Sequence, residues 1–358
     1  MKKIIFILLI IFQLFFYNCV EEDKTAKEID KIAVDFQVSR FDQEFAKTNA
    51  ENLNTIKKEY PYLFPPQYTD SVWIAKTQDT IQQELNEEVE KAFPNFDIET
   101  KELEQLFKHI KYYYPKFKEP KVITLTSDVA YNNRVILADS ILLIGLDNYL
   151  GKDHKFYTGF QNYIATALDK QFIISDVASE FCGQIVPKES GRTFLDQIIY
   201  YGKELYLKDK LIPFQSEAQR MVYTPEQLEW AKANEEQIWR YFVERELLYS
   251  TEKQLHQRFL DPAPFSKFQL ELIDSESPGR IGRFMGWQIV RSFMENNEVS
   301  LQQMLAIPAD EIFKKSLLRN PNGIGLFRQT KSLKNLITNL KSNGEITYIR
   351  NNIKSRLR

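Results

Sequence analysis

Apolar residues recur every three or four positions in two segments of the first third of the chain, and this spacing predicts amphipathic helices. The first stripe consists of Ile81, Leu85, Val89 and Phe93, with four glutamates largely on the opposite side. The second stripe consists of Leu103, Leu106, Phe107 and Ile110. Pro115 follows the second stripe and ends that helix, because proline cannot continue the helical hydrogen-bond pattern.

Segments rich in Val, Ile and Leu mark the middle third and predict a small β-sheet. The two runs cover residues 122–126 and 134–145, and Asp139-Ser140 is a turn point within the second run. A short alternation over 34–38 predicts an earlier strand that breaks at Arg40. Residues 60–68 contain three prolines and predict a turn or an extended loop.

From residue 163 onward the pattern is mainly helical, and three segments carry signals for the start of a helix. These signals are Thr193 with Asp196, Thr224-Pro225-Glu226-Gln227, and Ser300 with Gln303. The order along the chain is helices, a small central sheet and more helices. This order predicts an α+β fold that is mostly helical.

The first nineteen residues have the organisation of an export signal. Two lysines precede an apolar run over 4–16, which is too short to cross a bilayer, since a spanning helix needs about 20 apolar residues. Cys19 follows this run, and the arrangement resembles a bacterial lipoprotein signal, in which the cysteine is lipidated. We expect residues 1–18 to be the signal peptide and residues 19–31 to be a flexible, charged tether. An ordinary secreted protein and an uncleaved membrane anchor are the alternatives.

The composition excludes a nucleic-acid-binding protein that depends on a general basic charge. The formal net charge is −2 over 358 residues, and the hydrophobic content of 43% permits a large buried core. Cys182 is the only cysteine besides Cys19, and its apolar helix indicates a place in the core.

The segment from Lys314 to Arg358 differs from the rest of the chain in its charge, with eleven basic residues and only Glu345 acidic. It predicts either a solvated tail or a contact with anionic lipid or lipopolysaccharide.

The chain carries no sequence motif for nucleotide binding or nucleophilic catalysis, and its three histidines are not paired at helical spacing. Two segments nevertheless stand out: one is 174–186, followed by 192–203, and the other is 277–290. Gly282 and Gly286 in the latter segment predict a smooth helix face that another backbone can approach closely. Arg280 and Arg283 predict either surface charge beside packed helices or a contact with an anion or a partner.

Several segments together resemble the GldB family of gliding-motility lipoproteins. They are the lipoprotein signal, Val38-Ser39-Arg40-Phe41-Asp42, residues 176–210, Pro278 to Val290, and a last segment near 307–313. The resemblance implies a lipid-anchored envelope protein that acts with other gliding-motility envelope proteins, and it brings no biochemical activity. We expect a single GldB-like α+β domain over 32–325 and a basic C-terminal extension over 326–358.

A more distant resemblance, to predicted zinc proteases of the gluzincin kind, rests on a sheet, two helices and Pro-Gly-Arg-Ile-Gly in that order. It places the zinc-binding His-Glu-x-x-His motif on residues 179–183 and the third ligand on Tyr201. Glu180 matches the motif, whereas Ser179, Gly183 and Tyr201 stand where the ligands would be. These residues do not replace imidazole and carboxylate. The resemblance therefore implies a degenerate zincin-like scaffold with a vestigial groove, and without a metal, a cofactor or a catalytic residue.

The leading hypothesis is a non-catalytic, lipid-anchored component of the gliding machinery that works by protein–protein contact. One alternative is an envelope metallohydrolase that uses Glu180. Another is a binding module for cell-wall glycan or lipopolysaccharide that uses tryptophans, such as Trp230, Trp239 and Trp287, with arginines. We expect the protein in the outer membrane facing the periplasm. Residues 20–23 also resemble a surface-export signal, so exposure at the cell surface is a second possibility.

Overall fold

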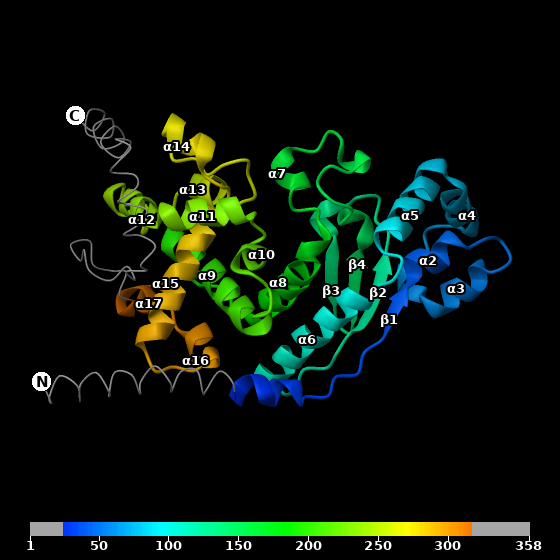
Figure 1. Ribbon diagram of the computed structural model, residues 1–358, viewed down its shortest axis with the longest axis horizontal. Coiled ribbons are helices and arrows are strands. Elements are labelled where there is room, and N and C mark those ends of the chain that lie inside the picture. The colour runs from blue at the N-terminus through cyan, green and yellow to red at the C-terminus, as the bar shows by residue number, and fades with distance from the viewer. Residues whose placement is uncertain (1–23, 317–358) are drawn as a thin grey trace, which may run out of the picture.

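The computed structural model describes residues 24–316 of the chain, which are mostly helical around one four-stranded sheet. Cys19, the predicted signal peptide and the basic extension over 326–358 lie outside the described residues. The sheet lies in the middle of the molecule, between short helices of the first third and a bundle of helices from the second half (Figure 1). The expected fold, mostly helical with a small sheet, is confirmed.

The sheet contains β1 (Val38–Arg40), β2 (Lys121–Leu125), β3 (Val135–Ala138) and β4 (Ile141–Gly145), in the order β1-β2-β4-β3. β2 lies parallel to β1 and β4, and β3 and β4 form an antiparallel hairpin. The hairpin turns at Asp139, whose φ of 48° suits a tight turn, so the strands expected within 122–126 and 134–145 are confirmed. The early strand begins at Val38 and ends with Arg40, later than the alternation predicts, because pairing with β2 begins only at Val38.

The side chains of β2 alternate between two apolar layers. Ile123 lies in a mainly aromatic cluster with residues of α2 (Phe41–Ala46), α3 (Leu53–Glu59) and the 3-10 helix η1 (Pro61–Leu63). Val122 lies in the main core with Leu142 and with residues of α6 (Asp97–Tyr113) and α8 (Ile173–Ile185). The sheet is therefore covered on both faces, and α8 is fixed against one of them.

The two predicted apolar stripes lie on α5 (Thr80–Ala92) and α6. Leu85, Val89 and Phe93 are buried, but Ile81 is 65% exposed because the first turn of α5 lies outside the core. The prediction for Ile81 is wrong.

Two further α-helices before α8 are α4 (Asp70–Gln78) and α7 (Asn162–Ala165). The prolines of 60–68 lie in η1 and the turn after it.

Two long helices, α9 (Phe194–Leu211) and α15 (Ile281–Asn296), form the centre of the second half of the fold (Figure 1). Around them lie α10 (Glu217–Met221), α11 (Pro225–Ala233), α12 (Glu235–Glu244), α13 (Gln254–Phe259), α14 (Glu271–Glu276), α16 (Leu301–Ala306) and α17 (Ala309–Lys315). Thr193, Thr224 and Ser300 each begin a helix with a capping box, as the sequence predicts. A Cβ on Gly286 would lie 1.7 Å from the carbonyl oxygen of Ile198, so the close approach predicted at this glycine is confirmed.

The segment before β1 differs from the flexible tether predicted for residues 19–31. Residues 24–30 form a helix, and Ile29 is buried at 3% exposure. Lys111 on α6 donates a hydrogen bond to the carbonyl oxygen of Ala33 at 3.1 Å. One apolar side chain and a few polar contacts hold this segment, although its sequence has no apolar period.

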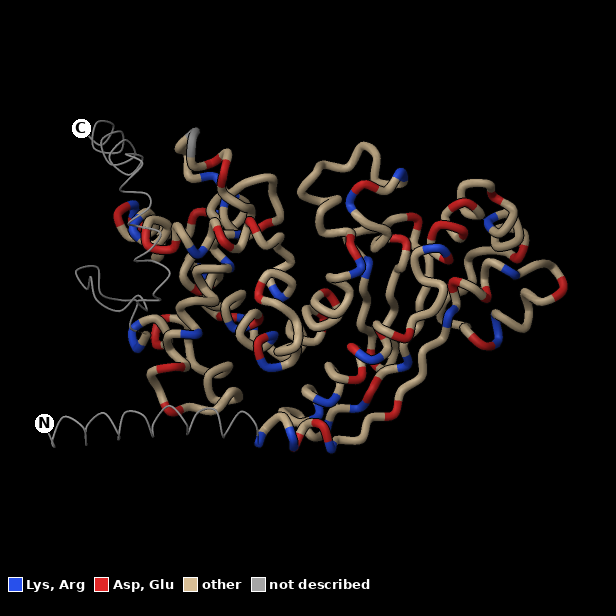
Figure 2. Tube along the Cα trace, viewed as in Figure 1, with Lys and Arg blue, Asp and Glu red and all other residues tan. Residues whose placement is uncertain are grey.

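Basic and acidic residues are interspersed along the described chain (Figure 2), in keeping with its small formal charge. Opposite charges pair along helix surfaces, as for Lys315 and Glu311 at 2.6 Å. Among residues 24–316, no helix combines the length and the apolar character that crossing a membrane requires.

Candidate functional site

A cavity of about 240 Å³ lies between α8, α9 and the start of α15, and we call it the central cleft. Mainly charged and polar side chains line it: Arg134, Asp176, Ser179, Glu180, Tyr201, Glu204, Lys208, Arg220, Arg280 and Arg283. The structure thus brings together five residues that the sequence singles out, namely Ser179, Glu180, Tyr201, Arg280 and Arg283. Gly183 lies one turn after Ser179 on α8, and a Cβ there would lie 4.0 Å from Oε1 of Glu204.

One face of α9 supplies three of the lining residues. Tyr201, Glu204 and Lys208 lie three and four positions apart, so they share this face. Because Gly286 lets α15 pack directly on α9, the start of α15 brings Arg280 and Arg283 to the same cavity.

The turn Pro278-Gly279-Arg280 leads into α15. A Cβ on Gly279 would lie 2.4 Å from the carbonyl oxygen of Ala263, so only glycine fits at this position. Arg280 has a φ of 62°, in the left-handed region, which costs a residue with a side chain about 1–2 kcal/mol. Its Nη2 donates a hydrogen bond to the carbonyl oxygen of Val222 at 2.6 Å. The fold therefore holds Arg280 at the cleft although its left-handed backbone conformation is unfavourable for a residue with a side chain.

Lys208 is buried at 5% exposure. Its Nζ donates to Oγ of Ser175 and to the carbonyl oxygen of Arg220, both at 3.0 Å. Burial lowers the pKa of Lys208 to about 8 and the pKa of Arg280 to about 10. Both groups are therefore mainly charged near neutral pH, in surroundings that disfavour charge.

Arg283 completes the cationic side of the central cleft. Its Nε donates to the carbonyl oxygen of Leu260 at 2.6 Å, and its guanidinium lies 3.9 Å from the centre of the Tyr201 ring. Within the described chain, Lys208, Arg280 and Arg283 form no ion pair with a carboxylate, and their hydrogen bonds go to neutral oxygens. These three positive charges are therefore not compensated by a direct partner.

Glu180 on α8 and Glu204 on α9 line the same cavity, and within residues 24–316 neither forms an ion pair. Burial raises the pKa of both carboxyl groups, and the charge of nearby Asp176 raises that of Glu180 further. Acids with raised pKa values and bases with lowered pKa values in one cavity are typical of a functional site.

Asp176 has a structural role in the cleft. It accepts two hydrogen bonds from Arg134, at 2.7 and 2.8 Å, and one from the Tyr149 hydroxyl at 2.9 Å. Arg134 directly precedes β3, so this buried pair joins the sheet to α8.

Sequence reasoning missed Arg134, Glu204 and Lys208 as residues of the cleft. The spacing from Tyr201 along one helix face indicates Glu204 and Lys208 once Tyr201 is considered. Arg134 carries no such signal, because it reaches the cleft only through the packing of the sheet against α8.

Residues with metal-binding chemistry do not gather in the described part of the chain. Among residues 24–316, no group of three or more His, Cys, Asp or Glu side chains could hold a metal ion. His154 contacts Glu88 at 3.3 Å, and His256 contacts Gln197 at 2.8 Å. Cys182 is buried as expected, and burial raises the pKa of its thiol.

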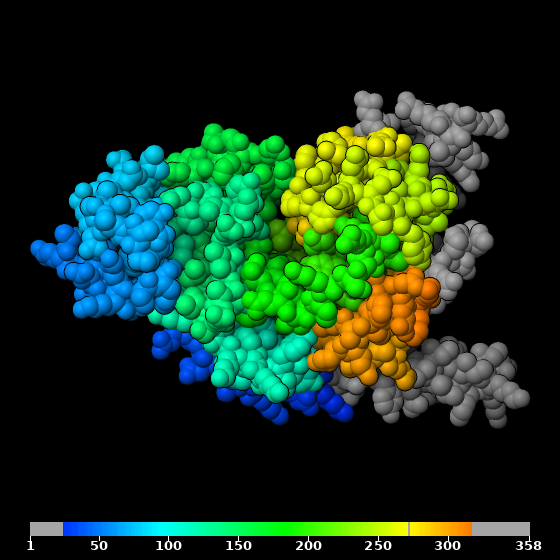
Figure 3. Space-filling view, turned by 180° about the vertical axis from the view of Figure 1, so that it is seen from behind, coloured from blue at the N-terminus to red at the C-terminus, as the bar shows by residue number. Residues whose placement is uncertain are grey.

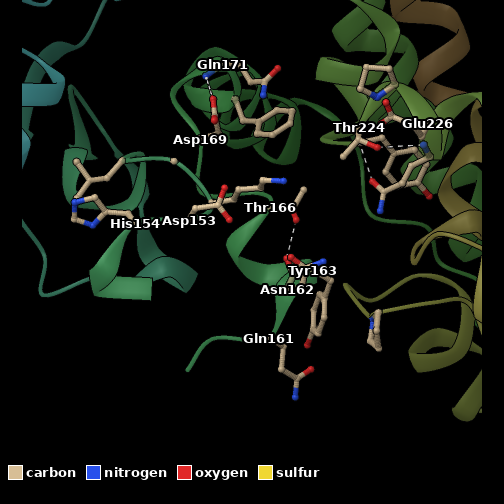
Figure 4. Close-up of a pocket in the computed structure, with 18 residues that line it drawn as sticks. Asp153, His154, Gln161, Asn162, Tyr163, Thr166, Asp169, Gln171, Thr224 and Glu226 are labelled. Carbon is tan, nitrogen blue, oxygen red and sulfur yellow. Dashed lines mark hydrogen bonds between the residues drawn. The ribbon is translucent and has the colours of Figure 1, made fainter. Parts of the chain in front are cut away.

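A larger cavity of about 850 Å³, the outer groove, lies beside the central cleft. One wall is the segment around 150–172, and the other includes the start of α11. Figure 4 shows Gln161, Asn162 and Tyr163 on the first wall, with Thr224 and Glu226 on the second. The surface is hollowed between the segment that carries α7 and the segment that carries α13 and α14 (Figure 3). The outer groove and the central cleft are neighbours along the chain, because 221–222 and Pro262 line the central cleft, whereas 223–227 and Pro264 line the outer groove.

The tryptophans do not form the sugar-stacking surface that the glycan-binding alternative requires. Trp287 is fully buried, and its Nε1 donates to Asp209 at 2.9 Å. Trp239 is 7% exposed, and Trp230 is partly buried against the main core. The assignment of Trp239 and Trp287 to glycan binding is wrong, because their rings are buried in the core.

The model of a family described as gliding motility protein GldB matches residues 22–319. The chain belongs to the GldB family. The match includes the central cleft and the outer groove, and it ends before the basic extension over 326–358. Membership makes the protein a gliding-motility lipoprotein and implies a lipid anchor in the cell envelope. No curated protein and no solved structure matches the chain.

Proposed function

We propose that this GldB-family protein is a non-catalytic component of the gliding machinery and that it binds a segment of a partner protein in the outer groove and the central cleft. The observation that carries the proposal is the central cleft itself. Five ionisable residues from α8, α9 and the start of α15 converge there without an ion pair in the described chain, whereas Asp176 pairs with Arg134; the five are Glu180, Glu204, Lys208, Arg280 and Arg283. Unpaired charges in a cavity cost stability, so their retention favours a binding role.

A protein segment suits the size and composition of the two cavities. The outer groove is about 850 Å³ and presents side-chain amides, among them Gln161, Asn162 and Gln171. Amides can both donate to and accept from a peptide backbone, and Tyr163 and Phe172 in the same groove offer apolar contact. The central cleft of about 240 Å³ is large enough for one polar end group of that segment.

The chemistry of the cleft disfavours a zinc-dependent reaction. The Ser179 hydroxyl donates to the carbonyl oxygen of Ser175 at 3.0 Å, and the Tyr201 ring is covered by Arg283. Gly183 offers no ligand atom. Among residues 24–316, Glu180 therefore has no set of metal ligands beside it to activate a water molecule, in keeping with a degenerate zincin-like scaffold.

We further propose that Cys19 is lipidated and anchors the protein in the outer membrane, with residues 32–325 as a single domain that faces the periplasm. The basic extension over 326–358 lies outside this domain. Support comes from the lipoprotein signal and from family membership. Other gliding-motility envelope proteins are the proposed partners.

The test that separates this proposal from a metallohydrolase is Glu180→Gln. Gln keeps the volume of the side chain and imitates the neutral carboxyl that burial favours at this position, so we expect cells with the variant to glide at nearly the speed of the parent strain. The measurement is single-cell speed on glass, with protein abundance checked by immunoblot. A hydrolase that uses Glu180 as its general base would lose gliding completely.

Zinc content gives an independent check on the same proposal. We expect protein purified without added metal to contain no stoichiometric zinc. If the protein holds one zinc per chain, and cells with normal amounts of the Glu180→Gln variant do not glide, the protein is instead a metallohydrolase.

A further inference from the structure

We propose that the partner segment presents a carboxylate to the central cleft, where Lys208, Arg280 and Arg283 bind it. This inference rests on the proposed function and specifies the chemistry that the cleft recognises. It assigns the central cleft as a carboxylate-binding site beside the outer groove.

The arrangement of donors supports an anionic ligand. Nη2 of Arg280 and Nε of Arg283 each make one hydrogen bond to a carbonyl oxygen, so most of their five N–H donors remain for a ligand. Both residues line the same cavity as Lys208. A guanidinium can bind a carboxylate through two parallel hydrogen bonds.

The neighbouring acids affect a dianion more than a monoanion. Glu180 and Glu204 line the cavity beside Lys208, Arg280 and Arg283, and burial raises the pKa of both acids. In its charged form either acid repels a dianion such as phosphate about twice as strongly as a carboxylate, because the Coulomb energy scales with the charge. In its protonated form either acid can donate a hydrogen bond to a bound carboxylate. The charged acids therefore penalise phosphate more than a carboxylate.

The small volume of the central cleft suits a carboxylate at the end of a peptide chain or on a short side chain. The central cleft holds only about 240 Å³, whereas the outer groove beside it holds about 850 Å³. A peptide that lies in the outer groove can insert its C-terminal carboxylate, or the side chain of an aspartate, into the cleft. Both sources have the same chemistry, and the choice of probes separates them.

The experiment uses the full-length lipidated protein in detergent micelles and measures binding by calorimetry at pH 7. The probes are acetyl-dialanine with a free carboxylate, its C-terminal amide, acetyl-aspartate amide and inorganic phosphate. We expect a carboxylate probe to bind at least about 10-fold more tightly than the neutral amide, because a charge-assisted hydrogen bond is lost in the amide. Tighter binding of acetyl-dialanine indicates a chain terminus, and tighter binding of acetyl-aspartate amide indicates a side chain.

Arg283→Gln and Arg280→Gln should each weaken binding of the preferred probe at least about 10-fold. Arg240→Gln is the matched control, because Arg240 lies on the exposed side of α12 and forms an exposed pair with Glu236, and the variant should bind like the parent protein. Circular dichroism melts confirm that each variant is folded. If Arg280→Gln unfolds, Arg283→Gln and the comparison with the neutral amide still decide the result.

Equal binding of carboxylate and amide, stronger binding of phosphate, or no binding of any probe overturns the inference. If a partner is captured at the outer groove in cells but no carboxylate probe binds, this inference fails and the proposed function stands. If no partner is captured at the outer groove and no carboxylate probe binds, the inference and the proposed function both fail.

Discussion

The substitution Gly286→Ala is expected to lower the free energy of unfolding strongly, by about 3 kcal/mol or more. The added Cβ would lie 1.7 Å from the carbonyl oxygen of Ile198, which is backbone of α9 and cannot rotate away. The two helices would have to separate along their contact. The measurement is the thermal midpoint of the purified chain, and we expect it to fall by at least about 6 °C.

Gly183→Ala is the matched control for this substitution. Gly183 is also helical, but a Cβ there would meet only Oε1 of Glu204 at 4.0 Å, which is ordinary contact. Alanine is preferred to glycine within a helix by up to about 1 kcal/mol, so this variant should be as stable as the parent or slightly more so. Equal midpoints for Gly286→Ala and the parent would disprove the close packing of α9 on α15.

The second large effect is expected for Asp176→Ala. The substitution removes the two hydrogen bonds that Arg134 donates to Asp176, leaving the one to the carbonyl oxygen of Tyr131, and it removes the acceptor of the buried Tyr149 hydroxyl. An arginine that is left partly buried without its partner costs about 3–5 kcal/mol, and denaturant unfolding measures this loss.

Glu236→Ala provides the comparison for Asp176→Ala. Glu236 forms an exposed pair with Arg240 at 3.0 Å, so its loss should cost less than about 1 kcal/mol. If the two variants lose similar stability, Asp176 does not join the sheet to α8 as described.

The local pattern of the sequence was sufficient for elements that carry a regular period or a helix cap. The hairpin at Asp139 and the helices that begin after Thr193 and Thr224 are examples. The short helices α2, α3 and α4 could not be predicted in this way. Their aromatic residues, such as Phe41 and Phe45, form a cluster across several segments and do not follow one helical stripe.

The candidate site was only partly predictable. Glu180, Arg280 and Arg283 stood out because they lie in unusual segments, and the fold brings them to one cavity. Arg134 could not be identified, because the approach of the sheet to α8 depends on contacts between residues far apart in the chain, whereas the helical spacing from Tyr201 indicates Glu204 and Lys208. A stripe on one helix reveals which residues share a face, but it does not reveal which cavity that face lines.

The direct test of partner binding in the outer groove is photo-cross-linking in gliding cells. A photoreactive amino acid at Glu226, which lines the outer groove, should capture one envelope protein that mass spectrometry identifies. The same residue at Ile98, which is 70% exposed on α6, should not capture it. Gly183→Leu, which projects a side chain toward Glu204, should abolish the adduct and stop gliding, whereas Gly183→Ala should preserve both. The absence of an adduct at Glu226, or an adduct and gliding that persist unchanged in Gly183→Leu, would contradict this account.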